Sequence, residues 1–589
     1  MSAGMSAGYP RPQLERSDWT SLNGQWDFAL DSDCRWGVPD QVAWNSTIVV
    51  PFAPETPASG IGNTGFYRSC WYRRALEVAK PAAGARVLLH FGAVDYEATV
   101  WLNGAIVARH EGGYTPFVAD ITDFLLLTST QTLVVRAEDD PQDLAKPRGK
   151  QDWQLKPHSI WYPRTTGIWQ TVWMETVAAT SIGTLRWTSN LERWEIGIEA
   201  RLNGVRREGL RLKVKLTAGD TLIADDTYAV VAGEVHRRIA LSDPGIDDYR
   251  NAILWSPERP MLIRAELELW GGRGELIDRV RSYTALRTVS AQDDRFFLNG
   301  RPYYLRMILD QGYWPETGLS ASSDETFRRD IELVKAMGFN GVRKHQKVED
   351  PRFLYLADTM GLMVWEEMPS AYRFTQKSVE RLTREWIEVI DRDYSHPCIV
   401  TWVPFNESWG VPDLPSIEAQ RHYVKALYNL TRTLDSTRPV IGNDGWESIA
   451  TDIIGIHDYE TDPARLAARY PSHDTPEVLR RQRPGGRALT IGIEGHAGQP
   501  VMLTEFGGIA YSADPAHTWG YGRSQTVADL EKRYTELLTV VNCISLFSGF
   551  CYTQFTDTYQ EANGLLYADR TPKIPIATIA HATTGLCDE

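Results

Sequence analysis

Hydrophobic and polar residues alternate along short segments in the first part of the chain. The segments RVLLHFGAV (86–94), EATVWLNG (97–104) and QTLVVRAE (131–138) are separated by Gly, Pro and Asp turns. Alternation with a period of two is typical of strands that bury one face. We therefore predict an all-β sandwich over residues 1–177.

A second β-rich region follows over residues 178–289. LRLKVKLTAG (210–219) and LIRAELELWG (262–271) alternate strictly. A segment of roughly 110 residues with this pattern fits an immunoglobulin-like sandwich.

From residue 290 the pattern changes to helices that alternate with short apolar strands. DETFRRDIELVKAMG (324–338) is amphipathic, and GVRKHQ (341–346) follows it as a strand. Eight strand–helix units in about 300 residues predict a (β/α)₈ TIM barrel over residues 290–589. The expected strands are 303–310, 341–346, 362–369, 398–408, 439–446, 453–459, 501–508 and 549–557.

Composition and charge narrow the possible partners. Hydrophobic residues make up 43% and charged residues 23%, as in ordinary globular proteins, and the net charge is -14. This charge argues against a nucleic-acid or anionic-membrane partner, since both attract clustered Lys and Arg. No apolar run reaches the roughly 18 residues of a membrane span, the N-terminus lacks an apolar signal core, and the six cysteines lack metal-site spacing. A cytoplasmic protein without a metal or other cofactor is expected.

Two glutamates follow apolar strand residues of the predicted barrel. Asn406-Glu407 ends the strand 398–408, and Glu505 lies in the strand 501–508. The carboxyl ends of barrel strands meet at one mouth, where active sites lie. Glycoside hydrolysis needs two carboxyl groups, which are about 5–5.5 Å apart in a retaining enzyme. A purely structural alternative is that each glutamate caps a helix or pairs with an arginine.

Four stretches resemble glycoside hydrolase family 2, which includes β-galactosidases, β-glucuronidases and β-mannosidases. They are WTSLNGQWDF (19–28), VDYEATVWLNGAIVARHEGGYTPFVADIT (94–122), VTWVPFNESWG (400–410) and MLTEFGG (502–508). The resemblance implies that the first sandwich is a jelly-roll sugar-binding domain. It also implies that Glu407 is the acid/base, that Glu505 is the nucleophile, and that Asn406 hydrogen-bonds the sugar 2-hydroxyl.

Other side chains at the predicted strand ends are candidates for binding the sugar. Arg343 and His345 alternate and point the same way, and Arg343 could instead orient Glu505. Asp310 could bind hydroxyl groups or cap a turn. The resemblance implies that Tyr459 hydrogen-bonds the nucleophile. The full set of substrate-binding candidates is Asn406, Asp310, Arg343, His345, Trp446, His457, Tyr459, Gln554 and Trp161.

The chain also departs from the family pattern. Leu309-Asp310-Gln311 stands where many members have Asn-Arg-His, and Tyr552, Gln554 or Phe555 must replace a Trp on the last strand. β-Glucuronidases carry a Lys two residues beyond an Asn, whereas Asn563 is followed by Gly564 and Leu565. A neutral sugar is therefore expected.

The loop KQDWQLKPHSIWYPRTTGIWQ (150–170) belongs to the first sandwich and is rich in aromatic residues. Trp161, Tyr162 and Arg164 either reach the sugar site or join the two domains. The segment EEMPSAYRF (366–374) contains no His, so no metal is expected beside the acid/base.

These features predict an exo-acting retaining glycosidase, with a β-galactoside as the first candidate substrate. The alternatives are a β-D-galactofuranosidase, an α-L-arabinofuranosidase, a β-mannosidase or an α-L-arabinopyranosidase. A transglycosidase or a non-catalytic carbohydrate-binding protein also stays open. Homo-oligomers are possible because members of the family often assemble.

Overall fold

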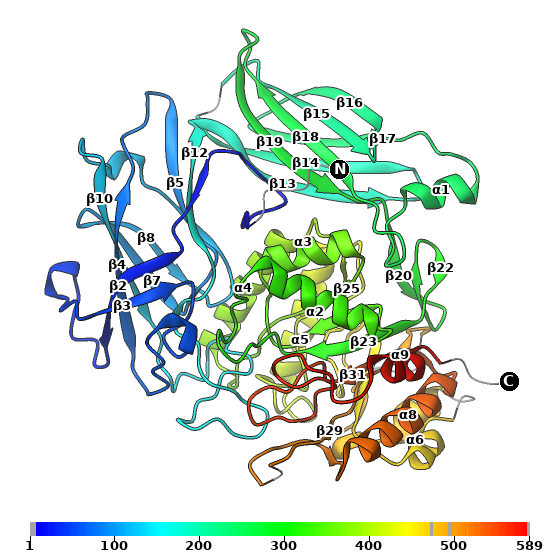
Figure 1. Cartoon of the computed structure of the whole chain (residues 1–589). Coiled ribbons are helices and arrows are strands. Elements are labelled where there is room, and N and C mark those ends of the chain that lie inside the picture. Colours follow the sequence, from blue (N-terminus) through cyan, green and yellow to red (C-terminus); the bar gives the residue numbers. More distant parts are fainter. Residues whose placement is uncertain (1–7, 206, 472–474, 493–496, 515, 586–589) are drawn as a thin grey trace.

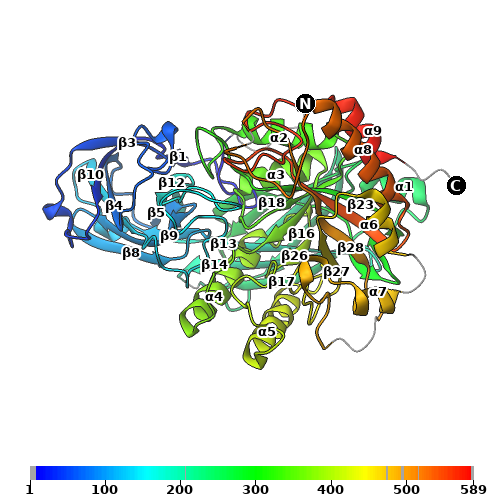
Figure 2. The same cartoon turned by 90° about the horizontal axis from the view of Figure 1, so that it is seen from below.

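The computed structural model describes residues 8–205, 207–471, 475–492, 497–514 and 516–585. Two β-sandwiches precede a barrel along the chain, and this multidomain architecture confirms the predicted fold class. The first sandwich, in blue, extends to one side of the barrel, and the second lies across one end of it (Figures 1 and 2).

The first sandwich consists of two antiparallel sheets with a shared apolar interior. The six-stranded sheet has the order β3-β2-β4-β10-β7-β8, and the four-stranded sheet has the order β1-β12-β5-β9. Leu133, Val135 and Ala137 of β10 alternate into the interior, as their period predicts. The strands are β1 Trp19–Ser21, β2 Gly24–Asp31, β3 Ser46–Val50, β4 Ser69–Glu77, β5 Ala85–Phe91, β6 Val94–Asp95, β7 Glu97–Leu102, β8 Ala105–Glu111, β9 Phe117–Asp120, β10 Thr130–Glu138, β11 Gly167–Ile168 and β12 Val172–Ala178.

The second sandwich pairs the sheet β13-β14-β17 with the sheet β16-β15-β18-β19. Ile263, Ala265, Leu267 and Leu269 of β18 are buried at every second position. The elements are β13 Thr180–Asn190, β14 Glu195–Gly204, β15 Arg211–Ala218, β16 Thr221–Ala229, β17 Glu234–Ala240, α1 Asp247–Ile253, β18 Ile263–Trp270 and β19 Leu276–Thr284. A small sheet of β20 Val289–Gln292, β21 Arg295–Leu298 and β22 Arg301–Pro302 leads into the barrel.

Seven parallel strands form the barrel sheet, in the order β26-β25-β24-β23-β31-β28-β27. They are β23 Leu305–Asp310, β24 Gly341–Lys344, β25 Met363–Glu367, β26 Ile399–Val403, β27 Ile454–Asp458, β28 Val501–Gly507 and β31 Phe547–Thr553. A short pair, β29 Ile509–Ala510 and β30 Gly522–Arg523, lies beyond β28. The helices are α2 Asp324–Ala336, α3 Pro351–Met360, α4 Gln376–Asp393, α5 Glu418–Leu434, α6 Pro463–Arg469, α7 Thr475–Arg481, α8 Val527–Cys543 and α9 Ile576–Thr584.

The strand predicted at 439–446 is not a regular strand. This segment makes only isolated parallel bridges, Val440 with Trp402 and Asp444 with Asn406. It still closes the barrel between β26 and β27, because Ile441 N donates to Trp402 O and His457 N donates to Gly445 O. Continuous pairing is interrupted where the polar side chains of this segment turn into the mouth of the barrel.

Helix ends follow the local sequence. The Asp350 side chain accepts a hydrogen bond from Arg352 N, Pro351 occupies the first turn of α3, and Gly361 ends this helix in the left-handed conformation at φ 73°. These signals fix where α3 begins and ends, between the end of β24 and the start of β25.

Helix α4 joins the first sandwich to the barrel. Tyr114 N donates to Glu385 Oε1 at 2.7 Å, and Arg381 pairs with Glu111 and Asp143 of the sandwich.

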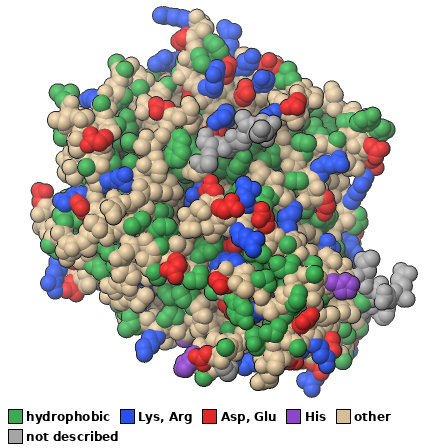
Figure 3. Space-filling view, in the orientation of Figure 1, with side chains coloured by type: hydrophobic (Ala, Val, Ile, Leu, Met, Phe, Trp, Pro, Cys, Tyr) green, Lys and Arg blue, Asp and Glu red, His purple; other side chains and the backbone are tan. Residues whose placement is uncertain are grey.

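Among the residues described, no helix combines the length and the apolar character needed to span a membrane. On the face shown in Figure 3, side chains of both charges are interspersed rather than gathered by sign.

We expect the substitution Glu385→Gln to stabilise the protein at high pH. Glu385 Oε2 is buried without a hydrogen-bond partner, and burial raises the pKa of this carboxyl group to about 8 despite the hydrogen bond from Tyr114 N. An unfolded glutamate titrates near about 4.3, so stability falls as the pH rises from there to about 8, while only the folded state keeps the proton. Glutamine keeps the acceptor and removes the charge.

At pH 9 the melting temperature of Glu385→Gln should exceed that of the wild type, which corresponds to roughly 1–3 kcal/mol of unfolding free energy. The gain should shrink as the pH falls and vanish at about pH 4, where an unfolded glutamate is also protonated. Glu388→Gln is the control on the same helix. Thr115 Oγ1 donates a hydrogen bond to the Glu388 carboxylate. Burial would raise the pKa of Glu388, but hydrogen bonds from His110 and Thr115 lower it. A gain for Glu385→Gln that is equal at both pH values would contradict the explanation by ionisation.

Candidate active site

Glu407 and Glu505 lie together at the mouth of the barrel. Glu505 is in β28, and Glu407 follows the end of β26. One carboxylate oxygen of each and one ring nitrogen of His457 all lie within 4.8 Å of one another. The pair expected from the sequence therefore shares one small space.

The backbone at Glu407 is in an uncommon conformation. Glu407 and Ser408 both have left-handed φ angles, 52° and 59°. Glu407 N donates to Asp444 O at 2.9 Å, and Ser408 N donates to Asn443 Oδ1 at 3.0 Å. Non-glycine residues rarely adopt this conformation, and such strain is concentrated at functional sites.

Glu407 and His457 form a coupled pair. His457 Nδ1 lies 2.8 Å from Glu407 Oε1, and Trp409 Nε1 donates to Oε2 at 3.3 Å. Burial would lower the pKa of His457, but the carboxylates of Glu505 and Asp444 raise it to about 10. Burial would raise the pKa of Glu407, but the hydrogen bond and charge of His457 lower it. At neutral pH the pair therefore holds one proton.

Glu505 receives a hydrogen bond from Tyr459 and lies beside two cations, Arg343 and His457, whose Nδ1 is 3.5 Å from Oε2. The Tyr459 hydroxyl donates to Oε2 at 2.5 Å, which is the contact expected of this tyrosine. Arg343 Nη1 lies 3.2 Å from Oε1, and His345 Nδ1 lies 3.9 Å from it. Burial keeps the pKa of His345 well below its ordinary value, so this imidazole is neutral.

Arg343 is fully buried and connects most of the site. Its Nε lies 2.6 Å from Glu367 Oε2, its Nη1 lies 2.6 Å from Asp444 Oδ2, and its Nη2 donates to Asn406 Oδ1 at 2.7 Å. This last bond fixes the Asn406 amide and leaves Asn406 Nδ2 buried without a partner. The amide is therefore available to donate to a ligand hydroxyl group.

Sequence reasoning missed Asp444. Its Oδ2 lies 3.1 Å from His457 Nε2, and its Oδ1 accepts from Thr504 Oγ1 at 2.8 Å. Although burial opposes this, Arg343 and His457 hold the pKa of Asp444 well below its usual range. The polar Asn443-Asp444 pair inside a predicted apolar strand was the available signal.

Trp446 also lies beside the pair. Its ring packs edge-on against His457 with centroids 5.6 Å apart, and its Nε1 is buried without a hydrogen-bond partner. Trp446 thus borders the space that contains the two carboxylates.

Asp310 and Gln554 lie at strand ends but use their polar atoms within the protein. Asp310 Oδ1 accepts from Gly312 N, and Oδ2 pairs with Lys344 at 2.6 Å. Gln554 accepts from Gln311 Nε2 and donates to Asn563 Oδ1. These contacts correspond to the turn-capping alternative for Asp310 and link Gln554 to Gln311 and Asn563.

The loop from the first sandwich reaches the mouth of the barrel. Arg148 N and Gly149 N both donate to Ser370 O, at 3.0 and 3.1 Å. The Trp161 ring packs edge-on against Trp409, with centroids 5.6 Å apart, and its Nε1 donates to the Tyr372 hydroxyl. Trp161 therefore contacts the residue that bonds Glu407, and it also joins the two domains.

The same loop closes another side of the mouth. The Tyr162 hydroxyl donates to Glu561 Oε2 at 2.5 Å, and Gln560 Nε2 donates to the Trp161 carbonyl. Arg164, in contrast, pairs with Asp139 inside the first sandwich. The walls of the site thus come from two domains.

Two described clusters have donor atoms close enough to bind a metal ion. One is Glu407, His457 and Glu505, and the other is Asp358, His396 and Cys398. Asp358 already accepts hydrogen bonds from Tyr283, His396 and Cys398 N. Hydrogen bonding explains both clusters without an ion.

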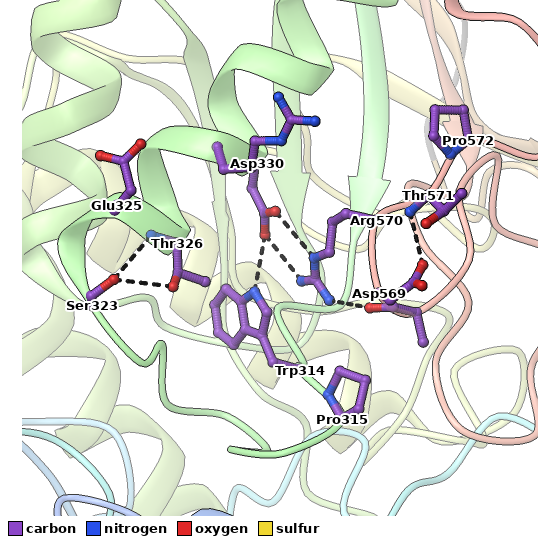
Figure 4. A pocket seen from close by; sticks show the side chains of 12 residues that line it. Trp314, Pro315, Ser323, Glu325, Thr326, Asp330, Asp569, Arg570, Thr571 and Pro572 are labelled. Atoms are coloured by element: carbon purple, nitrogen blue, oxygen red, sulfur yellow. Dashed lines mark hydrogen bonds and ion pairs between the residues drawn. The ribbon is translucent and has the colours of Figure 1, made fainter.

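A separate cavity of about 560 Å³ opens beside α2 (Figure 4). Asp330 in its wall accepts hydrogen bonds from Trp314 Nε1 and from the Arg570 guanidinium. Neither Glu407 nor Glu505 lines this cavity, and these three polar groups satisfy one another.

Comparisons with known proteins agree with this architecture. Residues 289–586 match the model of the TIM barrel domain of glycosyl hydrolases family 2, and residues 19–138 match the sugar binding domain of that family. A β-galactosidase of Thermoanaerobacter pseudethanolicus is 27% identical over 382 residues, which are 63% of this chain and 48% of that protein. A β-glucuronidase of Sus scrofa is 26% identical over 573 residues, covering 85% and 82%. The chain spans about half the length of the first curated relatives that it matches.

Solved structures share the fold over the whole chain. A β-D-glucuronidase from Dictyoglomus thermophilum has a TM-score of 0.77 at 20% identity and covers 98% of this chain and 99% of its own. A β-galacturonidase from Eisenbergiella tayi bound to glycerol has a TM-score of 0.72 at 20% identity, covering 99% of each chain.

We expect Gly149→Ala to detach the loop from the barrel. Gly149 has φ +57°, and a Cβ atom there would lie 2.4 Å from Gln346 O. Hydrogen exchange of residues 148–164 should rise about tenfold or more, because local opening that becomes easier by roughly 1.4 kcal/mol changes exchange tenfold. Exchange of β5 and β10 should stay unchanged.

Gly60→Ala is the matched control. Gly60 also has a positive φ, +80°, but an added Cβ atom would meet nothing within 4 Å. Both variants carry the backbone penalty of roughly 1 kcal/mol, so only the collision differs. Equal hydrogen exchange of residues 148–164 in the two variants would contradict the explanation that the added Cβ atom at Gly149 displaces the loop from the barrel.

Proposed function

Because this chain belongs to glycosyl hydrolases family 2, we propose that it is a retaining exo-glycosidase with Glu407 as acid/base and Glu505 as nucleophile. The observation that carries the proposal is the proximity of the two carboxylates, with one oxygen of each within 4.8 Å. Retaining enzymes hold their carboxyl groups about 5–5.5 Å apart, and inverting enzymes about 6.5–9.5 Å apart, to admit a water. The short separation favours direct attack by Glu505.

The reaction has two steps. Glu505 attacks the anomeric carbon, the bond to the leaving oxygen breaks with its electron pair, and Glu407 gives that oxygen a proton. Glu407 then takes a proton from water, whose oxygen attacks the anomeric carbon and releases Glu505. Oε1 of Glu505 is the candidate attacking atom, since Tyr459 occupies Oε2 and Oε1 accepts no hydrogen bond.

The Glu407–His457 pair supplies the proton of the first step. The pair holds one proton across the 2.8 Å contact, because the pKa of His457 is raised to about 10 by Glu505 and Asp444 against the effect of burial. When that proton passes to the leaving oxygen, the pair becomes a carboxylate and a neutral imidazole, which can accept the proton of water. His457 thus tunes the acid/base group.

Asn406 and Arg343 have supporting roles in this proposal. Asn406 Nδ2, which has no partner in the protein, donates to the hydroxyl group beside the anomeric carbon. Arg343 forms an ion pair with Glu505 at 3.2 Å and holds the Asn406 amide in place.

The enclosed mouth supports exo action. The contacts of Tyr162 with Glu561 and of Gln560 with Trp161 close one side of the site. In this proposal the wall stops a sugar chain from continuing beyond the terminal residue. Named relatives include both β-galactosidases and β-glucuronidases, so their names support a glycosidase acting on carbohydrate without choosing the sugar.

The roles of the two carboxylates can be separated with azide. We expect Glu505→Ala and Glu407→Ala to lower kcat/KM on nitrophenyl glycosides by about 10²–10⁴-fold or more. Azide should rescue Glu407→Ala with a glycosyl azide of retained configuration, because it attacks the glycosyl–Glu505 ester. With Glu505→Ala it should attack the substrate directly and give the inverted product.

The variants should be tested on a panel of nitrophenyl glycosides. It should contain the β-galactoside, β-glucoside, β-mannoside, β-glucuronide, β-galacturonide, β-galactofuranoside, α-L-arabinofuranoside and α-L-arabinopyranoside. Glu418→Ala, on the exposed side of α5, is the control and should keep full activity. Hydrolysis that survives the loss of both glutamates is the result that rejects this mechanism.

The acid/base pair should also appear in the pH dependence. In the wild type the proton of the pair is lost only near pH 10, so kcat/KM should stay high up to about that pH. In His457→Gln the proton resides on Glu407 alone, and the basic limb of the profile should move to lower pH by at least about one pH unit. Rates measured from pH 5 to 10 test this shift.

His422→Gln is the matched histidine control, because that side chain is exposed on α5. Its profile should overlay that of the wild type. A basic limb that does not move in His457→Gln would show that His457 does not share the proton.

A further inference from the structure

Lys150 projects from the loop of the first sandwich that docks on the barrel. The neighbouring Arg148 N and Gly149 N bond to Ser370 O, and Tyr162 N donates to the Lys150 carbonyl. Gly149 packs against Gln346 and Pro369, which follow β24 and β25. The backbone at Lys150 is thereby fixed at the mouth, and only 6% of the residue is exposed.

The ammonium group of Lys150 has no partner among the residues that the structure describes. No carboxylate oxygen comes within 4.0 Å of it, and no acceptor receives a hydrogen bond from it. A buried charge is normally paired, because removing it from water is costly. Among the described residues, Lys150 therefore lacks the carboxylate counter-ion that other buried lysines have.

The other buried lysines of the described chain underline this difference. Lys344 pairs with Asp310 and Glu349, Lys347 pairs with Glu349, and Lys573 pairs with Asp557. Lys146 pairs with Asp139. Each has a carboxylate partner within the protein, and only Lys150, which faces the active site, does not.

The charge of Lys150 acts on residues from three sides of the mouth. It opposes the effect of burial on the pKa of Glu407 and of Glu561, and it adds to the effect of burial in lowering the pKa of His345. These residues follow β26, β31 and β24, so the charge of Lys150 reaches three sides of the mouth. Glu561 is not the counter-ion, since Tyr162 and Asn563 occupy its oxygens.

We propose that Lys150 binds a carboxylate of the terminal sugar, so that the enzyme acts on glycosides of acidic sugars. The proposal rests on the retaining glycosidase function proposed above. A carboxylate of the sugar would give Lys150 the partner that it lacks among the described residues, through a charge-assisted hydrogen bond. A neutral hydroxyl group would leave the charge uncompensated.

This inference revises the neutral sugar expected from the sequence. That expectation considered only the barrel loop, where Leu565 stands two residues beyond Asn563. In the folded chain the cation reaches the mouth from the other domain. Asn563 belongs to the same part of the mouth, because it donates a hydrogen bond to Glu561 and the charge of Lys150 lowers the pKa of Glu561 against the effect of burial.

Paired substrates that differ only at C6 test the assignment. We would measure kcat/KM of the wild type, Lys150→Met and Lys150→Arg on the nitrophenyl β-glucuronide and β-glucoside, and on the β-galacturonide and β-galactoside. The wild type should prefer the acidic member of at least one pair. Lys150→Met should lose on the order of 100-fold on that member and little on the neutral one, and Lys150→Arg should keep part of the preference.

Lys156→Met is the matched control, since Lys156 lies on the same loop and is exposed. It should behave as the wild type, and all variants should have the same melting temperature. Better cleavage of the neutral members by the wild type, or equal losses on both members in Lys150→Met, would overturn the assignment.

A binding measurement separates this inference from the proposed function. Calorimetric titration of free glucuronate and galacturonate, against glucose and galactose, requires no turnover. Binding of a uronate that is lost in Lys150→Met, in an enzyme that cleaves nothing on the panel, would support Lys150 and reject the glycosidase proposal. If azide gives the expected products but the enzyme neither prefers nor binds a uronate, the glycosidase proposal is supported and the role of Lys150 is rejected.

Discussion

One buried guanidinium organises the mouth of the barrel. Arg343 touches Glu367, Asp444 and Glu505 and also orients Asn406. Burial alone would lower the pKa of Arg343, but these three carboxylates raise it well above its ordinary value. Without this cation, three acids would repel one another in a space that excludes water. The positions of both catalytic candidates therefore depend on a residue that need not take part in the reaction.

His457 provides a second, smaller centre of charge. It contacts Glu407 on one side and Asp444 on the other, and Asp444 is also bound by Arg343. The two cations and the surrounding carboxylates form one continuous network from β24 to β28. A change in the charge of any member therefore acts on Glu407 and Glu505 through direct contacts.

Much of this arrangement could be predicted from the sequence. The alternation in β10 and β18 marked strands, and the spacing of Glu407 and Glu505 at strand ends brought the two carboxylates together. Residues at strand ends are predictable because the parallel sheet fixes which end faces the mouth. Arg343 was a candidate because of its place at a strand end, whereas Tyr459 was a candidate because the family resemblance implies a tyrosine beside Glu505.

Features that depend on side-chain partners were not predictable in the same way. Asp444 lies in a segment expected to be a regular strand, and its role depends on Arg343 and His457, which are distant in sequence. Gln554 is at a strand end, yet its amide is used by Gln311 and Asn563. The loop that begins at Lys150 was expected to reach the site or to join the domains, but a single sequence does not show which of its side chains are buried without a partner.

The docked loop has a consequence for the order in which the enzyme is made. Residues 148–162 leave the ribosome before Glu505 and Glu561 are synthesised. The first sandwich can fold as a unit during synthesis, but the space enclosed by Tyr162 and Glu561 exists only after strand β31 and the segment that follows it have been added. A chain that has not reached this segment therefore holds a finished sugar-binding domain and no assembled site, and it stays catalytically silent until Glu561 has been added.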